Sequence, residues 1–141
     1  MSSNKLTAAQ EKRIRSALEK VPFANLLGIE LDSFAPGTAI VALTLRREHL
    51  QNNGVVHGGV IASLIDTATA FAVLTVVPKE ERVTTVDLTI TYLRSLVEGR
   101  VRARAEVLRT GRRVIAVSAE VLTEDETLAA TALSTYLRLG V

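Results

Sequence analysis

The chain has 141 residues, of which 48% are apolar, with no cysteine and a formal net charge of +2. This length fits one domain that buries roughly two-thirds of the surface of its unfolded chain, and the composition argues against disorder and excludes disulfides and thiolate metal sites. Aromatic residues make up only 4% and no nucleic-acid motif is present, so a nucleic acid is not expected as a partner.

The predicted elements form one α+β domain spanning residues 1–141. Thr7 caps the first helix, and residues 1–27 comprise this helix and its lead-in. The last four strands are joined by short turns such as Thr110-Gly111, which predicts an antiparallel meander. In chain order we expect a helix at 8–20, strands at 29–34 and 38–45, a helix at 58–77 ending before Pro78, and strands at 83–94, 99–109, 112–123 and 127–139.

The predicted helix at 58–77 has no polar face, which an antiparallel sheet wrapped around it would explain. It is long and apolar enough to suggest a membrane span, but Asp66 and its scattered hydroxyl residues favour a helix buried in protein, and no membrane partner is expected. In the following strand, alternation places Val86, Leu88 and Ile90 on one face and Thr85 and Asp87 on the other.

Asp66 is the only charged residue between Gly58 and Pro78, and a lone carboxylate in an apolar helix is costly unless it is paired or used. Gly58 and Gly59 follow His57 where the helix should start, which indicates close backbone approach. Two interpretations of Asp66 stay open from the residues alone. It is either a catalytic group or a structural carboxylate satisfied by a neighbouring hydroxyl or backbone group.

Other polar residues point less directly to a site. His49 has no second ligand at metal-binding spacing, so no metal is expected. Most arginines of the second half alternate with apolar residues on predicted strands, which is typical of a solvated face. The N-terminal residues are polar and lack the apolar core of a signal peptide, which predicts a cytoplasmic protein.

The segment Asn53-Gly54-Val55-Val56-His57-Gly58-Gly59, followed by an apolar helix with Asp66 nine positions after the His, resembles the hotdog-fold acyl-CoA thioesterases. The nearest groups are the phenylacetic-acid-degradation type and the 4-hydroxybenzoyl-CoA relatives, and the similarity covers nearly the whole chain, including the strand that ends at Arg94. The resemblance implies a hotdog fold, hydrolysis of acyl-CoA thioesters to a carboxylic acid and CoA, and no cofactor.

The resemblance also implies catalytic roles. Asp66 would act as nucleophile on the thioester carbonyl or as general base on water, and the Gly59 N–H would stabilise the oxyanion. His57 would hold the loop or touch the carbonyl. Gln51 lies where the family orients the attacking water with Asn or Gln. Members with Asp on the helix usually carry Asn there, so one of the neighbouring asparagines, Asn52 or Asn53, is an alternative.

Further residues enter by the same resemblance. Thr85 matches a strand position where relatives place a Ser or Thr near the water, and Arg94 and Ser95 lie where a CoA phosphate or the pantetheine arm would run. Asn53 and Gly58 are further candidates for substrate binding. The family's site lies between two protomers, which implies a homodimer and, beyond it, a dimer of dimers.

Two other functions remain open at this point. One is a hotdog relative acting as an acyl-thioester dehydratase or hydratase, and the other is a non-catalytic acyl-CoA-binding module. The acyl group is also open, with medium-chain fatty acyl and aryl acyl groups both compatible with the composition.

Overall fold

The computed structural model describes residues 5–140, so the extreme N-terminus, on which the expected absence of a signal peptide rests, lies mostly outside the described residues. The helices are α1 (Ala8–Glu19), α2 (Pro22–Leu27), the short 3-10 helix η1 (Arg47–His49) and α3 (Gly58–Leu74). The strands are β1 (Glu30–Ala35), β2 (Thr38–Thr44), β3 (Arg82–Tyr92), β4 (Arg100–Thr110), β5 (Val114–Leu122) and β6 (Leu128–Leu139). Every strand bound lies within two residues of its predicted position.

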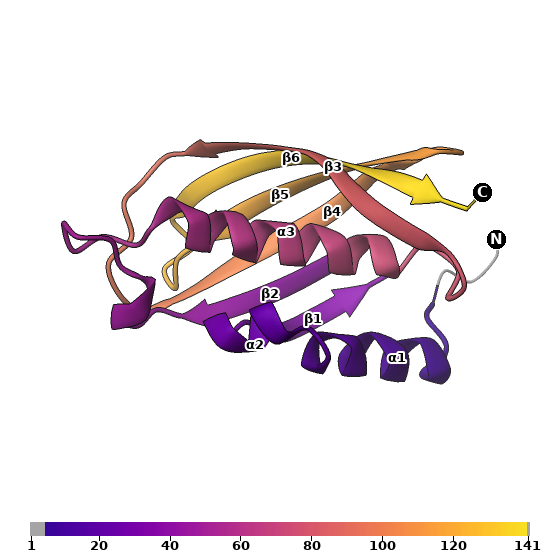
Figure 1. The fold of residues 1–141 in the computed structure, drawn as a ribbon, viewed down its shortest axis with the longest axis horizontal. Helices are drawn as coiled ribbons and strands as arrows, with labels where there is room; N and C mark the ends of the chain where they lie inside the picture. Colours follow the sequence, from indigo (N-terminus) through magenta and orange to yellow (C-terminus); the bar gives the residue numbers. More distant parts are fainter. Residues whose placement is uncertain (1–4, 141) are drawn as a thin grey trace.

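One curved antiparallel sheet lies against α3, which confirms the α+β class (Figure 1). The strand order is β1-β2-β4-β5-β6-β3. β4, β5 and β6 form the predicted meander, but the prediction was wrong for β3, which pairs with β6 and not with β4. The connection after β3 runs along one end of the sheet, where the Val56 N–H donates to the Leu96 carbonyl and the Leu45 N–H to that of Gly99. β3 therefore forms a free edge.

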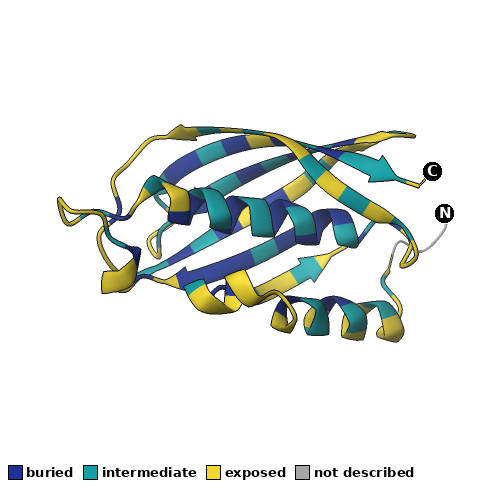
Figure 2. Cartoon of the chain, in the orientation of Figure 1, coloured by how far each residue is buried: buried dark blue, intermediate teal, exposed yellow. Residues whose placement is uncertain are grey.

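The apolar residues of α3 face the sheet, as the lack of a polar face predicted, but one stripe of the helix is partly exposed (Figure 2). The stripe follows the helical spacing from Gly59 through Ser63, Asp66 and Ala70. Asp66 is thus only partly buried. α3 ends at Leu74, earlier than the predicted Val77, because the Thr75 hydroxyl donates to the Ala72 carbonyl and accepts from the Gly37 N–H.

The N-terminal segment contains a second helix that the sequence analysis missed. Thr7 caps α1 with a reciprocal capping box to Gln10, as predicted for the cap. Pro22 starts α2, since its missing N–H costs nothing in the first turn. Gly28 ends α2 with a left-handed φ of 85°.

Both edge strands carry a bulge. In β1 the register shifts between Leu31 and Ser33, and in β3 it shifts between Thr85 and Asp87, which leaves Val86 as an extra residue. The bulge breaks the predicted alternation at Val86, which is 55% exposed, while Leu88 beyond it packs inward. Thr85 therefore lies on the inner face together with Leu88.

Among the described residues, the helices are each too short or too polar to cross a membrane. Apolar side chains from β2, β4, β5, β6 and from α1, α2 and α3 form a buried cluster beneath the partly exposed stripe, and partly buried side chains of β1 and β3 pack against it. The sheet and this cluster hold α3 in place, so the residues on its outer stripe have defined positions.

Candidate active site

The start of α3 is built around His57, the N-cap residue. Its Nδ1 accepts a hydrogen bond from the Gly59 N–H at 2.8 Å, and its carbonyl accepts from the Val60 N–H. A Cβ at position 59 would lie 2.9 Å from His57 Nδ1, and one at position 58 would lie 3.3 Å from the Tyr92 hydroxyl. The two glycines are needed because neighbouring side chains approach the backbone this closely.

The loop before α3 is held by His49, which is 1% exposed. Its Nδ1 accepts from the Arg46 N–H at 3.1 Å, which leaves Nε2 to donate to the Leu27 carbonyl at 2.9 Å. The His49 carbonyl accepts from the His57 N–H at 2.9 Å. His49 thus links the end of α2 to the residue that caps α3, a structural role rather than a metal-binding one.

The residues between Leu50 and Val56 form a small exposed loop closed by a β-bridge. The Gln51 N–H donates to the Val55 carbonyl at 2.8 Å, and the Val55 N–H donates to Asn53 Oδ1 at 3.4 Å. The side chains of Gln51, Asn52 and Asn53 are exposed at this end of the molecule.

Asp66 lies near the middle of α3 and is contacted from the sheet. The Thr85 hydroxyl donates to Asp66 Oδ1 at 3.0 Å. The Tyr136 hydroxyl on β6 lies 3.4 Å from the same oxygen and 3.1 Å from the Asp66 carbonyl. Thr85 reaches Asp66 because the bulge at Val86 keeps its side chain on the inner face.

Gly59 and Asp66 are seven residues apart on the same helix face. At 1.5 Å per residue they lie about 10 Å apart along the helix axis. One group lies at the start of α3 and the other near its middle. The structure therefore brings Asp66 and Thr85 together and, separately, His57, Gly58 and Gly59.

Several predicted substrate-binding residues share one small cavity of about 300 Å³. Gly58, Arg94 and Ser95 line it together with Gln51, whereas Asp66 and Asn53 are not among its lining residues. Arg94 and Ser95 lie just beyond the end of β3, which stops at Tyr92 rather than at the predicted position 94. The cavity connects the loop before α3 with the segment after β3.

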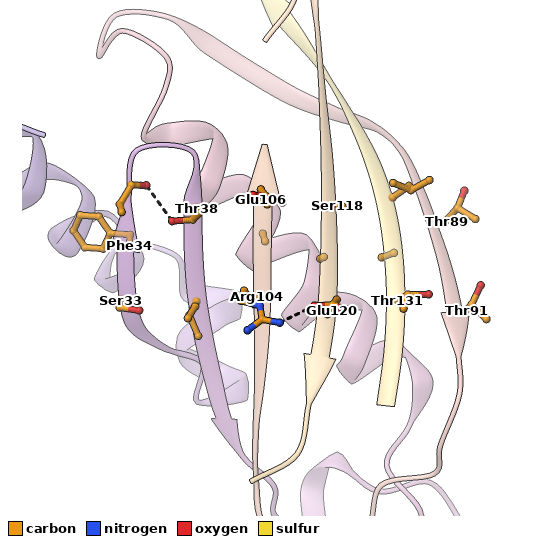
Figure 3. A pocket seen from close by; sticks show the side chains of 16 residues that line it. Ser33, Phe34, Thr38, Thr89, Thr91, Arg104, Glu106, Ser118, Glu120 and Thr131 are labelled. Carbon is orange, nitrogen blue, oxygen red and sulfur yellow. Dashed lines mark hydrogen bonds and ion pairs between the residues drawn. The ribbon is translucent and has the colours of Figure 1, made fainter. Parts of the chain in front are cut away.

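A larger cavity of about 960 Å³ lies on the opposite face of the sheet (Figure 3). Arg104, Glu120 and Thr131 are among its lining residues, and Arg104 donates to Glu120 Oε1 at 2.8 Å. α3 lies behind the sheet in this view, so this cavity is separated from Asp66 and from the helix start.

Two tyrosines contact the candidate site, and the sequence analysis assigned a site role to neither. The Tyr92 hydroxyl donates to the Gly58 carbonyl at 2.7 Å, and Tyr136 contacts Asp66. Burial is the main cause that raises the pKa of Tyr136 to about 12. Alternating strand patterns mark both residues only as strand residues, so spacing gave no signal for their hydroxyl contacts.

No cluster of three or more potential metal ligands occurs within residues 5–140. Asp66 has hydroxyl neighbours, not further carboxylates or imidazoles. The arrangement can hold one carboxylate at the surface of a helix, and it offers main-chain N–H groups at the helix start.

Comparison with known proteins supplies the family. The sequence profile described as Thioesterase superfamily matches residues 53–130. The medium/long-chain acyl-CoA thioesterase YigI of Salmonella typhimurium is 31% identical over 132 aligned residues, which cover 83% of this chain and 85% of that protein.

Solved structures agree with this match. The E. coli PaaI protein from the phenylacetic acid degradation operon superposes with a TM-score of 0.85 at 26% identity, covering 93% of this chain and 94% of that chain. A thioesterase family protein from Silicibacter pomeroyi gives a TM-score of 0.85 at 26% identity, covering 92% and 98%. Because the profile match spans more than half of the chain and YigI aligns with most of it, the chain belongs to the Thioesterase superfamily and is a thioester hydrolase with the hotdog fold.

Proposed function

We propose that this chain hydrolyses acyl-CoA thioesters to a carboxylic acid and free CoA, with Asp66 as the catalytic carboxylate. The position of Asp66 carries the proposal: its side chain lies on the partly exposed stripe of α3, with Oδ1 held by Thr85. Within residues 5–140, no hydrogen bond reaches Oδ2. Oδ2 is not buried, so it is accessible to a water molecule or to a substrate. Similarity to YigI, a medium/long-chain acyl-CoA thioesterase, supports CoA esters as the substrate class.

Two routes are compatible with this arrangement. As a nucleophile, Asp66 Oδ2 would attack the thioester carbonyl, CoA would leave with the sulfur electron pair, and water would hydrolyse the resulting anhydride. As a general base, Asp66 would take a proton from water while the water oxygen attacks the carbonyl. Both routes place negative charge on the carbonyl oxygen, so both need a hydrogen-bond donor there. Thr85 lies beside the reacting oxygen in either route.

We assign the oxyanion donor to the Gly59 N–H, at the start of α3, where the helix dipole favours negative charge. This N–H now donates to His57 Nδ1, so its use requires the His57 ring to turn away or to share the donor. His57 is exposed and has room to do so. Gln51 would orient the attacking water, with Asn52 or Asn53 as the alternative.

The cavity beside the helix start provides a place for the CoA arm. Gly58 and Ser95 line it, and the Arg94 guanidinium supplies a positive charge for a phosphate group. Asn53 lies at the adjacent loop tip, where it would contact substrate from outside the cavity. The thioester would then extend from this cavity towards a carboxylate.

A second copy of the chain would bring that carboxylate within reach. Gly59 and Asp66 lie about 10 Å apart along one helix axis, so the complete site takes each from a different protomer. The 11-residue strand β3, which contains Thr85, forms one edge of the sheet. The backbone groups on its outer side favour pairing with another copy. We propose a two-fold homodimer through β3, with Asp66 facing the partner subunit's Gly59, and a dimer of dimers as the larger assembly.

Replacement of Asp66 tests the function. Asp66→Asn keeps the size of the side chain and removes its charge, so the release of free CoA from acyl-CoAs is expected to fall by roughly 1000-fold or more, in the range that single catalytic groups supply. Medium-chain, long-chain and aryl acyl-CoAs are tested as separate substrates, and a thiol reagent detects the CoA that is released.

Asp32→Asn serves as the matched control, because Asp32 is an exposed carboxylate on β1, at the opposite edge of the sheet from β3. Near-normal turnover by Asp66→Asn would contradict the assignment. Hydration of an unsaturated acyl-CoA without CoA release, or binding without turnover, would instead support the dehydratase or the binding module.

Mixing two inactive variants tests whether the site is shared. In a heterodimer of Asp66→Asn and Gly59→Pro, one site combines both defects and the other combines intact Asp66 with intact Gly59. Random exchange of subunits is therefore expected to restore about a quarter of normal activity in a symmetric dimer. A site contained in a single chain would remain inactive in every mixture, and that result would contradict the shared site.

A further inference from the structure

Tyr136 is a buried ionisable residue that the proposed reaction does not use, and it is only 2% exposed. Its ring lies on the inner face of β6, in the cluster beneath α3, directly opposite Thr85 on β3. Its hydroxyl lies 2.8 Å from Thr69 Oγ1, 3.1 Å from the Asp66 carbonyl and 3.4 Å from Asp66 Oδ1.

The Tyr136 hydroxyl keeps its proton under ordinary conditions. Burial, as the largest cause, raises the pKa of Tyr136 to about 12, and the nearby Asp66 carboxylate adds to the rise. Thr69 Oγ1 also lies 3.1 Å from the Asp66 carbonyl, so the phenol proton has three oxygens within reach, two of which belong to Asp66. A neutral phenol can therefore remain a hydrogen-bond donor to Asp66 across the pH range in which a carboxylate is ionised.

The hydrogen bonds to the Asp66 side chain converge on a single oxygen. Thr85 on β3 and Tyr136 on β6 both donate a hydrogen bond to Oδ1. Within the described residues, Oδ2 accepts no hydrogen bond. Two donors on one oxygen restrict rotation of the carboxylate about its last bond. The unbonded oxygen is then directed to the open side of α3.

We infer that Tyr136 is a positioning residue for thioester hydrolysis, which together with Thr85 holds Asp66 Oδ1 so that Oδ2 faces the substrate. The inference rests on the proposed role of Asp66. Packing alone would not require the hydroxyl, because phenylalanine fills nearly the same volume. The hydroxyl is therefore the part of Tyr136 that the inference concerns.

Tyr136→Phe tests this role by deleting one oxygen atom. Partners that orient a catalytic group typically contribute about 10- to 100-fold, so kcat for CoA release is expected to fall by about 10-fold or more. KM is expected to stay within about two-fold, because Tyr136 is buried under the helix and does not contact substrate. A kcat within two-fold of the original enzyme would overturn the inference.

Ser134→Ala is the matched control. Ser134 lies two residues away on the same inner face of β6 and is also buried, but its hydroxyl donates to the Asp87 carbonyl at 3.0 Å and not to Asp66. Both variants lose a buried hydroxyl, so both are expected to lower the melting temperature. Only Tyr136→Phe is expected to lower kcat, and an equal loss of kcat in the two variants would show a general structural effect and overturn the inference.

The double variant Asp66→Asn/Tyr136→Phe tests whether Tyr136 acts through Asp66. If it does, residual turnover of the double variant equals that of Asp66→Asn, because the group that Tyr136 positions is already disabled. A further loss of about 10-fold would show an independent role and overturn the inference. Normal turnover by Asp66→Asn alone would instead remove the proposed function, which keeps the two failures distinct.

Discussion

The two tyrosines of the chain mark two regions of the candidate site that are built differently. Tyr92, on the edge strand, is half-exposed and donates to a main-chain carbonyl, that of Gly58. Tyr136, on β6, is buried and contacts the side chain of Asp66. The helix start is thus made of backbone atoms near solvent, while the carboxylate is fixed by side chains from below. The first region can adjust with the exposed His57 ring, whereas the second is held from two strands.

After Asp66→Asn, the largest effect is expected at the backbone region. Gly59→Pro removes the proposed oxyanion donor, and loss of one such donor typically costs about 100- to 1000-fold in kcat. Position 59 lies in the first turn of α3, where proline needs no hydrogen bond from its nitrogen, so the helix is expected to persist. Steady-state CoA release and circular dichroism provide the measurements.

Gly59→Ala separates loss of the donor from crowding. Alanine retains the N–H, but its Cβ would lie 2.9 Å from His57 Nδ1, so the ring must move. The alanine variant is expected to lose less activity than the proline variant. If the two lose the same activity, the N–H is not the group that acts on the substrate.

A smaller effect is expected from Tyr92→Phe, which frees the Gly58 carbonyl. Loss of one hydrogen bond contributes about 1 kcal/mol, which corresponds to roughly a five-fold fall in kcat/KM if it is felt at the helix start. Amide hydrogen exchange at Gly59 and Val60 should become faster, while the amides near Asp66 keep their protection. Faster exchange around Asp66 instead would show that the two regions are not separate.

The last prediction concerns stability in alkali, which leaves turnover near neutral pH unchanged. The pKa of Tyr136 is raised from 10.0 to about 12 in the folded chain, mainly by burial, so the folded state holds this proton more tightly than the unfolded state. The resulting stability is fully present below about pH 10 and is lost as the pH rises through about 12. At one pKa unit per 1.36 kcal/mol, this amounts to at most about 3 kcal/mol.

Urea unfolding of the original chain and of Tyr136→Phe, at pH 8 and near pH 11, measures this contribution to the free energy of unfolding. The other ionisable groups are the same in both proteins, so their contributions cancel in the difference. The free energy of unfolding of the original chain should fall more steeply with pH than that of the variant. Parallel losses in the two proteins would contradict the raised pKa.

The sequence predicted the scaffold because its signals are local. Period-two alternation located the last four strands, the Pro36-Gly37 turn separated the first two, and the apolar run that begins after His57-Gly58-Gly59 located the long helix. The order in which the strands pair could not be predicted from local signals. β3 and β4 are neighbours in the chain with a short connection, yet β3 pairs with β6, and local patterns contain no information on that choice.

The inner face of β3 could not be predicted by counting residues. Alternation placed Thr85 opposite Leu88, but the extra residue Val86 inverts the phase and turns both inward. Thr85 entered the candidate site by family resemblance, and the bulge is the physical reason that it contacts Asp66. Tyr136 follows Asp66 by 70 residues and was indistinguishable from an ordinary core aromatic.

The bulge in β1 has a consequence for how far assembly can proceed. If two copies join through β3, the outer ends of the combined sheet are two β1 strands. Each is only six residues long and is interrupted between Leu31 and Ser33, which makes it a poor template for another strand. In such a dimer, edge-to-edge growth would stop at two chains, and open-ended fibres would be avoided without a cap on either side.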